Sequence, residues 1–176
     1  MVLLKQLFLF FHIITVCIGL GGALISDFTF IKAIKDNFLD KNELKFLNFL
    51  GNIVMLNLPL IYISGMLIFL LDERNYLENP RFLTKVLVVV ILTINGIFVH
   101  KYLLPNMQSI INRDELKNKK TILFASGALS VTSWILALSL AIFKTPLLSI
   151  SQYISIYLFA LFIAFICSFL VLKRKV

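Results

Sequence analysis

Five long stretches of the chain contain no Asp, Glu, Lys or Arg. These charge-free runs cover residues 6–26, 46–71, 86–100, 121–143 and 145–172. A helix needs roughly 20 apolar residues to cross the hydrocarbon core of a bilayer. The third run is too short unless Lys85 extends outward at one end and the helix continues to Leu104 at the other. The runs predict an all-α integral membrane bundle of five transmembrane helices, formed as one domain over residues 1–176.

The composition favours the same class of protein. Hydrophobic residues make up 60% of the chain and charged residues only 15%, with a mean hydropathy of +0.95. Soluble domains are about 45–50% apolar and about 25% charged. These values exclude a soluble enzyme, a disordered chain and a disulfide scaffold. The two cysteines, Cys17 and Cys167, lie inside apolar runs and match no metal or redox spacing.

Four helix-start signals lie at the edges of the charge-free runs. They are the spacings Asp40-x-x-Glu43 and Asn112-x-x-Glu115 and the pairs Asn79-Pro80 and Thr145-Pro146. The first two have the pattern of a capping box, and the other two place a capping side chain before a proline at the first helical position. We therefore expect a helix to begin at each of these points.

Lys and Arg are distributed unevenly between the two ends of the expected helices. Twelve of the 17 fall on the side that carries the loop between the first and second runs, and five on the other side. The positive-inside rule then predicts an outside N-terminus and a C-terminus in the cytoplasm, in a bacterial cytoplasmic membrane. The first run is too long for a cleaved signal peptide, and only Lys5 precedes it. The net charge of +8 lies in short loops, so we expect lipid headgroups as its partner and no nucleic acid.

Small residues recur at four-residue spacing in the first, fourth and fifth runs. In the first run they are Thr15, Gly19 and Ala23. Such stripes mark faces where helices pack closely, within the bundle or against a second copy or another membrane protein. Asn57 and Asn95 fall near the middle of neighbouring runs and are in position to hydrogen-bond to each other.

Carboxylates are absent from the charge-free runs. Carriers that couple transport to protons or sodium use a carboxylate inside the membrane. Internal repeats, which many carriers contain, are hard to build from five spans. A carrier of metals or neutral solutes would also need a Cys, His and Met cluster that this sequence lacks. The sequence therefore disfavours transport.

The two histidines fall at different depths. His12 lies near the outer end of the first run, on the face of Thr15 and Gly19, and His100 lies next to Lys101 at the cytoplasmic end of the third run. Their depths differ by about ten residues, or ~15 Å, so they cannot be the two axial ligands of one haem. We expect His100 to extend to the lipid headgroups. For His12, a helix-contact role and a role in contacting haem or a quinone both stay open.

Three short stretches carry a family resemblance. They are Phe-His-Ile-Ile at 11–14 before a Gly-Gly pair, Ser-Gly-Met-Leu at 64–67 after Pro59, and Phe-Leu-Thr-Lys-Val-Leu-Val at 82–88. They resemble the membrane-embedded, haem-binding protoporphyrinogen IX oxidases and the copper-resistance D-like membrane proteins, over roughly residues 8–105. The resemblance implies a haem-type site, with His12 as the metal ligand and Lys85 as a second cofactor-contacting residue. Haem b is the cofactor that it implies.

Two classes of function remain open from the sequence. The first is a small multi-pass membrane protein that binds haem through His12 as the single axial ligand and takes part in redox chemistry. The second is a non-catalytic membrane subunit or assembly factor that docks partner helices on its small-residue stripes. The sequence does not decide whether the chain is an enzyme.

Overall fold

The computed structural model describes residues 2–36, 38–71, 76–112, 117–143 and 148–173. In chain order its elements are α1 (Val2–Asp36), α2 (Lys41–Leu71), the 3₁₀ turn η1 (Tyr76–Glu78), α3 (Pro80–Phe98), the π turn η2 (Val99–Leu103), the 3₁₀ turn η3 (Leu104–Asn106), α4 (Met107–Asn112), α5 (Lys117–Ile142) and α6 (Ile150–Lys173). These described residues form no β-strand, which confirms the all-α class.

Five helical segments are long and apolar enough to cross a membrane, as the charge-free runs predict. They are Val2–Asp36, Lys41–Leu71, Pro80–Asn112, Lys120–Ile142 and Ile150–Leu170. The third joins α3, the two short turns and α4 into one segment of 33 residues, so it exceeds the short run from which it was predicted. The first continues ten residues beyond Ser26, where its charge-free run ends.

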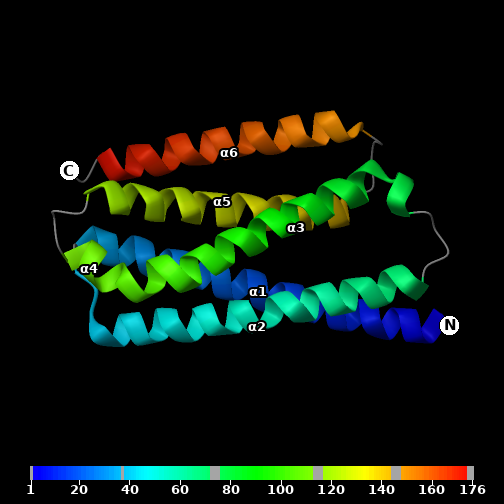
Figure 1. Ribbon diagram of the computed structural model, residues 1–176, viewed down its shortest axis with the longest axis horizontal. Coiled ribbons are helices and arrows are strands. Elements are labelled where there is room, and N and C mark those ends of the chain that lie inside the picture. The colour runs from blue at the N-terminus through cyan, green and yellow to red at the C-terminus, as the bar shows by residue number, and fades with distance from the viewer. Residues whose placement is uncertain (1, 37, 72–75, 113–116, 144–147, 174–176) are drawn as a thin grey trace.

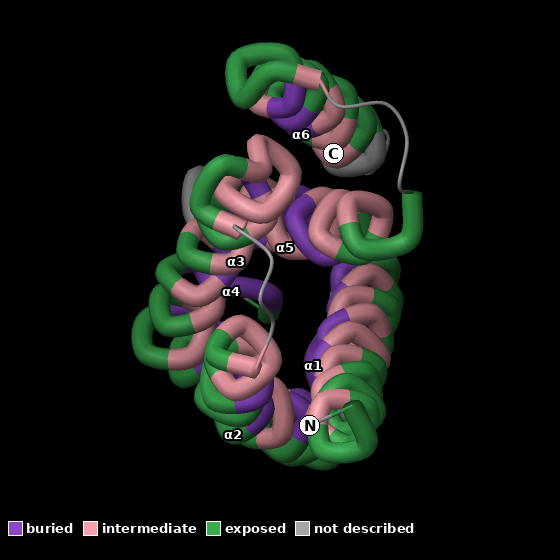
Figure 2. The backbone as a smooth tube through the Cα atoms, turned by 90° about the vertical axis from the view of Figure 1, so that its right-hand side faces the viewer, coloured by how far each residue is buried: buried purple, intermediate pink, exposed green. Residues whose placement is uncertain are grey.

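The helices run alongside one another, with α3 crossing the bundle at an angle (Figure 1). Viewed from the end, α1, α2, α3 and α5 surround the centre of the bundle and α6 lies outside this ring (Figure 2). Consistent with that view, α6 packs on α3 and α5. The buried faces of the four ring helices therefore enclose a common interior.

The two predicted helix starts that lie within the described residues are both present. At the start of α2 the Asp40 backbone N–H donates to a Glu43 carboxylate oxygen over 3.3 Å, which is half of a capping box. Before α3 the Asn79 side-chain oxygen accepts from the backbone N–H of Arg81 over 3.0 Å. The other two starts depend on positions 115, 145 and 146, which lie outside the described residues.

Two apolar clusters fill the centre of the bundle at different heights. The larger one closes the end at which α1 stops and α2 and α5 start; its buried members are Phe30, Ala33, Ile34, Leu39, Leu47, Leu103, Leu104, Met107, Ile110, Ile111, Leu123 and Phe124. The smaller one consists of Ala23, Ile61, Leu92 and Trp134. We call them the end cluster and the middle cluster.

The small-residue stripe of α1 is a contact face, as predicted. Thr15, Gly19 and Ala23 are all buried. A Cβ atom added at Gly19 would lie 2.8 Å from Cη2 of Trp134, a separation that real Cβ atoms essentially never show. Glycine at this position is therefore what lets α1 and α5 approach closely enough to form the middle cluster.

Candidate functional site

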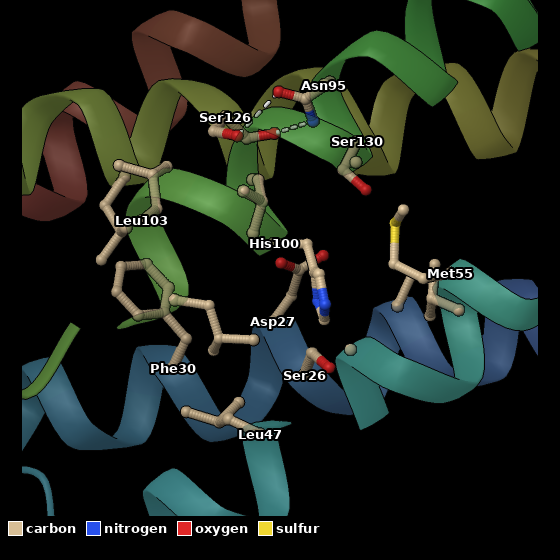
Figure 3. Close-up of a pocket in the computed structure, with 18 of the residues that line it drawn as sticks. Ser26, Asp27, Phe30, Leu47, Met55, Asn95, His100, Leu103, Ser126 and Ser130 are labelled. Atoms are coloured by element: carbon tan, nitrogen blue, oxygen red, sulfur yellow. Dashed lines mark hydrogen bonds between the residues drawn. The ribbon is translucent and has the colours of Figure 1, made fainter. Parts of the chain in front are cut away.

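A cavity of about 110 Å³ lies between the end cluster and the middle cluster. Its walls come from α1 to α5 and from the η2 and η3 turns, and most of its lining side chains are apolar. Four polar side chains without a hydrogen-bonded partner across the bundle line it: Ser26, Asp27, His100 and Ser130 (Figure 3). In this cavity, polar groups from several helices face the same open space.

Asp27 is the carboxylate of this cavity. Its Oδ1 lies next to Gly127 of α5, 3.5 Å from where a Cβ of that glycine would be. Its Oδ2 is buried and has no hydrogen-bond partner among the described residues. A carboxylate therefore lies inside α1, one residue beyond the charge-free run 6–26. The charge-free run stops at Ser26 because Asp27 is charged, whereas the helix itself continues.

His100 faces the interior, not the headgroups. Its Nδ1 lies 3.3 Å from where a Cβ of Gly51 on α2 would be, and it too is buried with no partner in the described part of the chain. Figure 3 shows the imidazole inside the cavity, drawn close to Asp27. The expectation that His100 extends outward is wrong because the η2 turn, where the helix hydrogen-bonds from Leu104 N–H to Val99 C=O, holds it over the glycine of the neighbouring helix.

A satisfied polar pair forms part of the cavity wall. The Asn95 side-chain amide donates to the Ser126 carbonyl over 3.0 Å, and the Ser126 hydroxyl donates back to Asn95 Oδ1 over 2.7 Å. This pair ties α3 to α5. The predicted bond between Asn57 and Asn95 does not form, because Asn57 donates to the carbonyl of Ile53 in its own helix.

A signal for the cavity residues was present in the sequence spacing. Asp27 continues the four-residue stripe of Thr15, Gly19 and Ala23, which places it on the interior face of α1. His100, in the η2 turn, follows Gly96 of α3 at the same spacing. Helical position is therefore the sequence signal that could have placed both residues in the interior.

His12 and Lys85, the site residues that the sequence predicts, lie in a separate polar cluster near the other end of the bundle. His12 Nδ1 is 2.8 Å from the Ser64 hydroxyl on α2, and its Cε1 is 3.5 Å from where a Cβ of Gly65 would be. Lys85 on α3 is close enough to act electrostatically on the His12 imidazole, and its Nζ lies 5.8 Å from the centre of the Phe82 ring. The structure thus brings the two predicted residues together, but neither lines the cavity.

The hydrogen bonds of Ser64 fix which nitrogen of His12 carries the proton. The Ser64 hydroxyl donates to the Leu60 carbonyl over 2.6 Å, so it accepts from His12, and Nδ1 is the donor. Nε2 is then the nitrogen with a free electron pair. A hydrogen bond from the second nitrogen is also the usual arrangement for a metal-binding histidine.

The cavity itself does not fit a macrocycle. An engineered cavity of about 150 Å³ holds one benzene molecule, so 110 Å³ leaves room for only a few heavy atoms. Within the described ranges, no three His, Cys, Asp or Glu side chains gather into a group that could hold a metal ion. A small molecule is the kind of ligand that matches the volume.

Comparisons of the chain with protein-family models, with curated proteins and with solved structures give no match.

Proposed function

We propose that this is a multi-pass membrane protein that binds a small solute in the cavity between α1, α2, α3 and α5. The observation that carries the proposal is that Asp27 and His100 line the cavity and that each has a buried polar atom, Oδ2 and Nδ1, without a partner among the described residues. Buried polar atoms are paired in more than about 90% of cases, and an unpaired one costs about 1–3 kcal/mol. A solute that hydrogen-bonds to the Asp27 and His100 side chains would reduce that cost.

Thiol chemistry at the cavity wall tests this proposal. In a background without cysteines (Cys17→Ala and Cys167→Ala), Ser130→Cys places a thiol in the cavity. Because a thiol at position 130 has open space beside it, we expect methyl methanethiosulfonate, a small neutral reagent, to modify it faster than a thiol that is packed on all sides. Mass spectrometry of the protein in membranes measures the rate.

Ser133→Cys is the matched control. Ser133 lies one turn further along α5, is fully buried and hydrogen-bonds to Tyr157 of α6. A thiol there should stay unmodified. Equal, slow rates at both positions would show that small solutes do not reach the cavity and would refute the proposal.

For the orientation, we propose that the N-terminus lies outside and that the end cluster lies at the cytoplasmic side of a bacterial membrane. The uneven distribution of Lys and Arg supports this. Described basic residues that gather toward the end-cluster side include Lys32, Lys35, Lys41 and Lys45, which flank the turn between α1 and α2. The cavity is then nearer the cytoplasm, and the His12 cluster nearer the outside.

A second candidate function is haem binding through His12, as the family resemblance implies. The specific observation in its favour is the Ser64 bond, which orients the imidazole and leaves Nε2 with its electron pair free. Protein purified from haem-replete cells should then show a Soret band that His12→Ala abolishes and His100→Ala preserves. No Soret absorbance in the wild-type protein would exclude this function and leave the cavity proposal intact.

A further inference from the structure

The cavity wall holds one ionisable carboxylate, Asp27, whose charge must be neutralised. Asp27 and His100 are the titratable residues among its described lining; α2, α3 and α5 contribute glycine, serine, asparagine and apolar side chains there, and no Lys or Arg. An ionised carboxylate without a partner is strongly disfavoured inside a helix bundle in a membrane. Asp27 must therefore carry a proton or face a cation.

The walls limit which cation fits. Mg²⁺ and Ca²⁺ require six or more oxygen ligands, and transition metals require several His, Cys or carboxylate groups, which the described lining does not supply. Met55, Leu58 and Leu92 make much of the remaining surface apolar. A ligand that matches these walls has one positive charge at one end and a short hydrocarbon chain at the other.

Resting on the proposed function, we propose that the cavity binds a small protonated aliphatic amine in exchange for a proton. The ammonium group lies against the Asp27 carboxylate beside the His100 imidazole, while the alkyl chain packs on the apolar wall. The exchange is balanced: Asp27–COOH + R–NH₃⁺ gives Asp27–COO⁻···⁺H₃N–R + H⁺. The carboxylate is neutralised in both states, so no bare charge is left in the bundle.

The volume sets the size of the amine. Benzene, with six heavy atoms, occupies about 150 Å³ in an apolar cavity. A cavity of about 110 Å³ therefore takes an amine of about five heavy atoms. Butylammonium has this size, and butanol has the same shape without the charge.

Trp134 provides a direct readout of binding. It is the single tryptophan of the sequence and it lines the cavity. We expect butylammonium chloride to change the Trp134 fluorescence of the purified protein in detergent and to release about one proton per bound amine, detected with a pH indicator in weakly buffered solution. Butanol should give a much weaker change and no proton release.

Asp27→Asn should weaken butylammonium binding about tenfold or more, because a charged hydrogen bond contributes about 1.5–3 kcal/mol, and it should abolish proton release. Asp36→Asn, a carboxylate exposed at the end of the same helix, is the matched control and should leave both unchanged. A melting curve for each variant establishes that it is folded.

The outcomes separate this inference from the proposed function. If butanol binds as well as butylammonium, or Asp27→Asn binds both equally, the amine assignment is wrong and the solute site remains. A fluorescence change with sodium chloride equal to that with butylammonium chloride would assign the site to an inorganic cation and overturn the amine. If no solute changes the fluorescence and the Ser130→Cys thiol is also unreactive, both proposals fail.

Discussion

Two polar clusters lie inside the same helix bundle and differ in how their hydrogen bonds are satisfied. In the cluster near the start of α1, the His12 imidazole donates to Ser64, which in turn donates to the Leu60 carbonyl. In the cavity, Asp27 and His100 each keep a buried atom without a partner in the described chain. Each cluster contains a histidine, a serine and a charged side chain, so residue types alone do not distinguish them.

The difference shows what each cluster contributes. A histidine that is bonded across two helices holds those helices together, and its removal should be felt as lost stability. A histidine without a protein partner contributes little to folding and leaves hydrogen-bonding capacity for a ligand. Stability and binding measurements should therefore respond oppositely to changes in the two clusters.

The largest loss of stability is expected where Gly19 of α1 packs on Trp134 of α5, between the His12 cluster and the cavity. Gly19→Leu would force a side chain into the ring of Trp134, so we expect a loss of at least about 1–3 kcal/mol in the free energy of unfolding. Leu20→Ala, rotated by about 100° on the same helix, should be milder. Thermal melting in detergent compares the two variants. Equal melting temperatures would contradict the close packing of Gly19 against Trp134.

An intermediate effect is expected from the two histidine-containing clusters. Ser64→Ala removes the acceptor of the His12 proton, and we expect a loss of about 0.6 kcal/mol, the average for hydrogen bonds between membrane helices, and of no more than about 1.7 kcal/mol. His100→Ala removes no protein hydrogen bond and should cost less stability, yet it should weaken butylammonium binding. A His100→Ala variant that is less stable than Ser64→Ala would reverse the comparison between the clusters.

The helices themselves were predictable from the sequence, because a membrane-spanning helix needs a long apolar run and the chain has five. The third helix was expected to be longer than its run, and it is. The contact face of α1 was predictable for the same kind of reason, since only small side chains allow backbones to approach. Both features depend on a pattern repeated along a whole helix, which the sequence shows directly.

The cavity could not be predicted from hydropathy, because it depends on single polar residues that lie within apolar helices. Asp27 ends the first charge-free run in the sequence. In the structure it lies on the small-residue face of α1, next to Gly127 of α5. His100 was assigned to the interface because it precedes Lys101, whereas the η2 turn points it inward. Which glycine faces which side chain is a tertiary fact that no local pattern contains.

The smallest effect on stability is expected from single cysteines in the loops, which test whether the cavity or the His12 cluster is nearer the cytoplasm. A cysteine at Asn118, on the strongly basic side, should be shielded from an impermeant thiol reagent in intact cells, and one at Asn75 should be labelled. Neither change should affect stability or binding. The reverse labelling pattern would place the cavity nearer the outside and the His12 cluster nearer the cytoplasm.

The η2 turn makes the cavity sensitive to chain length. Its backbone bond from Leu104 to Val99 spans one residue more than an α-helical bond would. Deleting one residue from Val99–Leu103 would let the helix close into regular α geometry and rotate Asn95 by about 100° relative to α4, which is anchored in the end cluster. A related chain that is shorter by that one residue would present other side chains to the cavity. Insertions and deletions in this turn would therefore change what the bundle binds more than substitutions would.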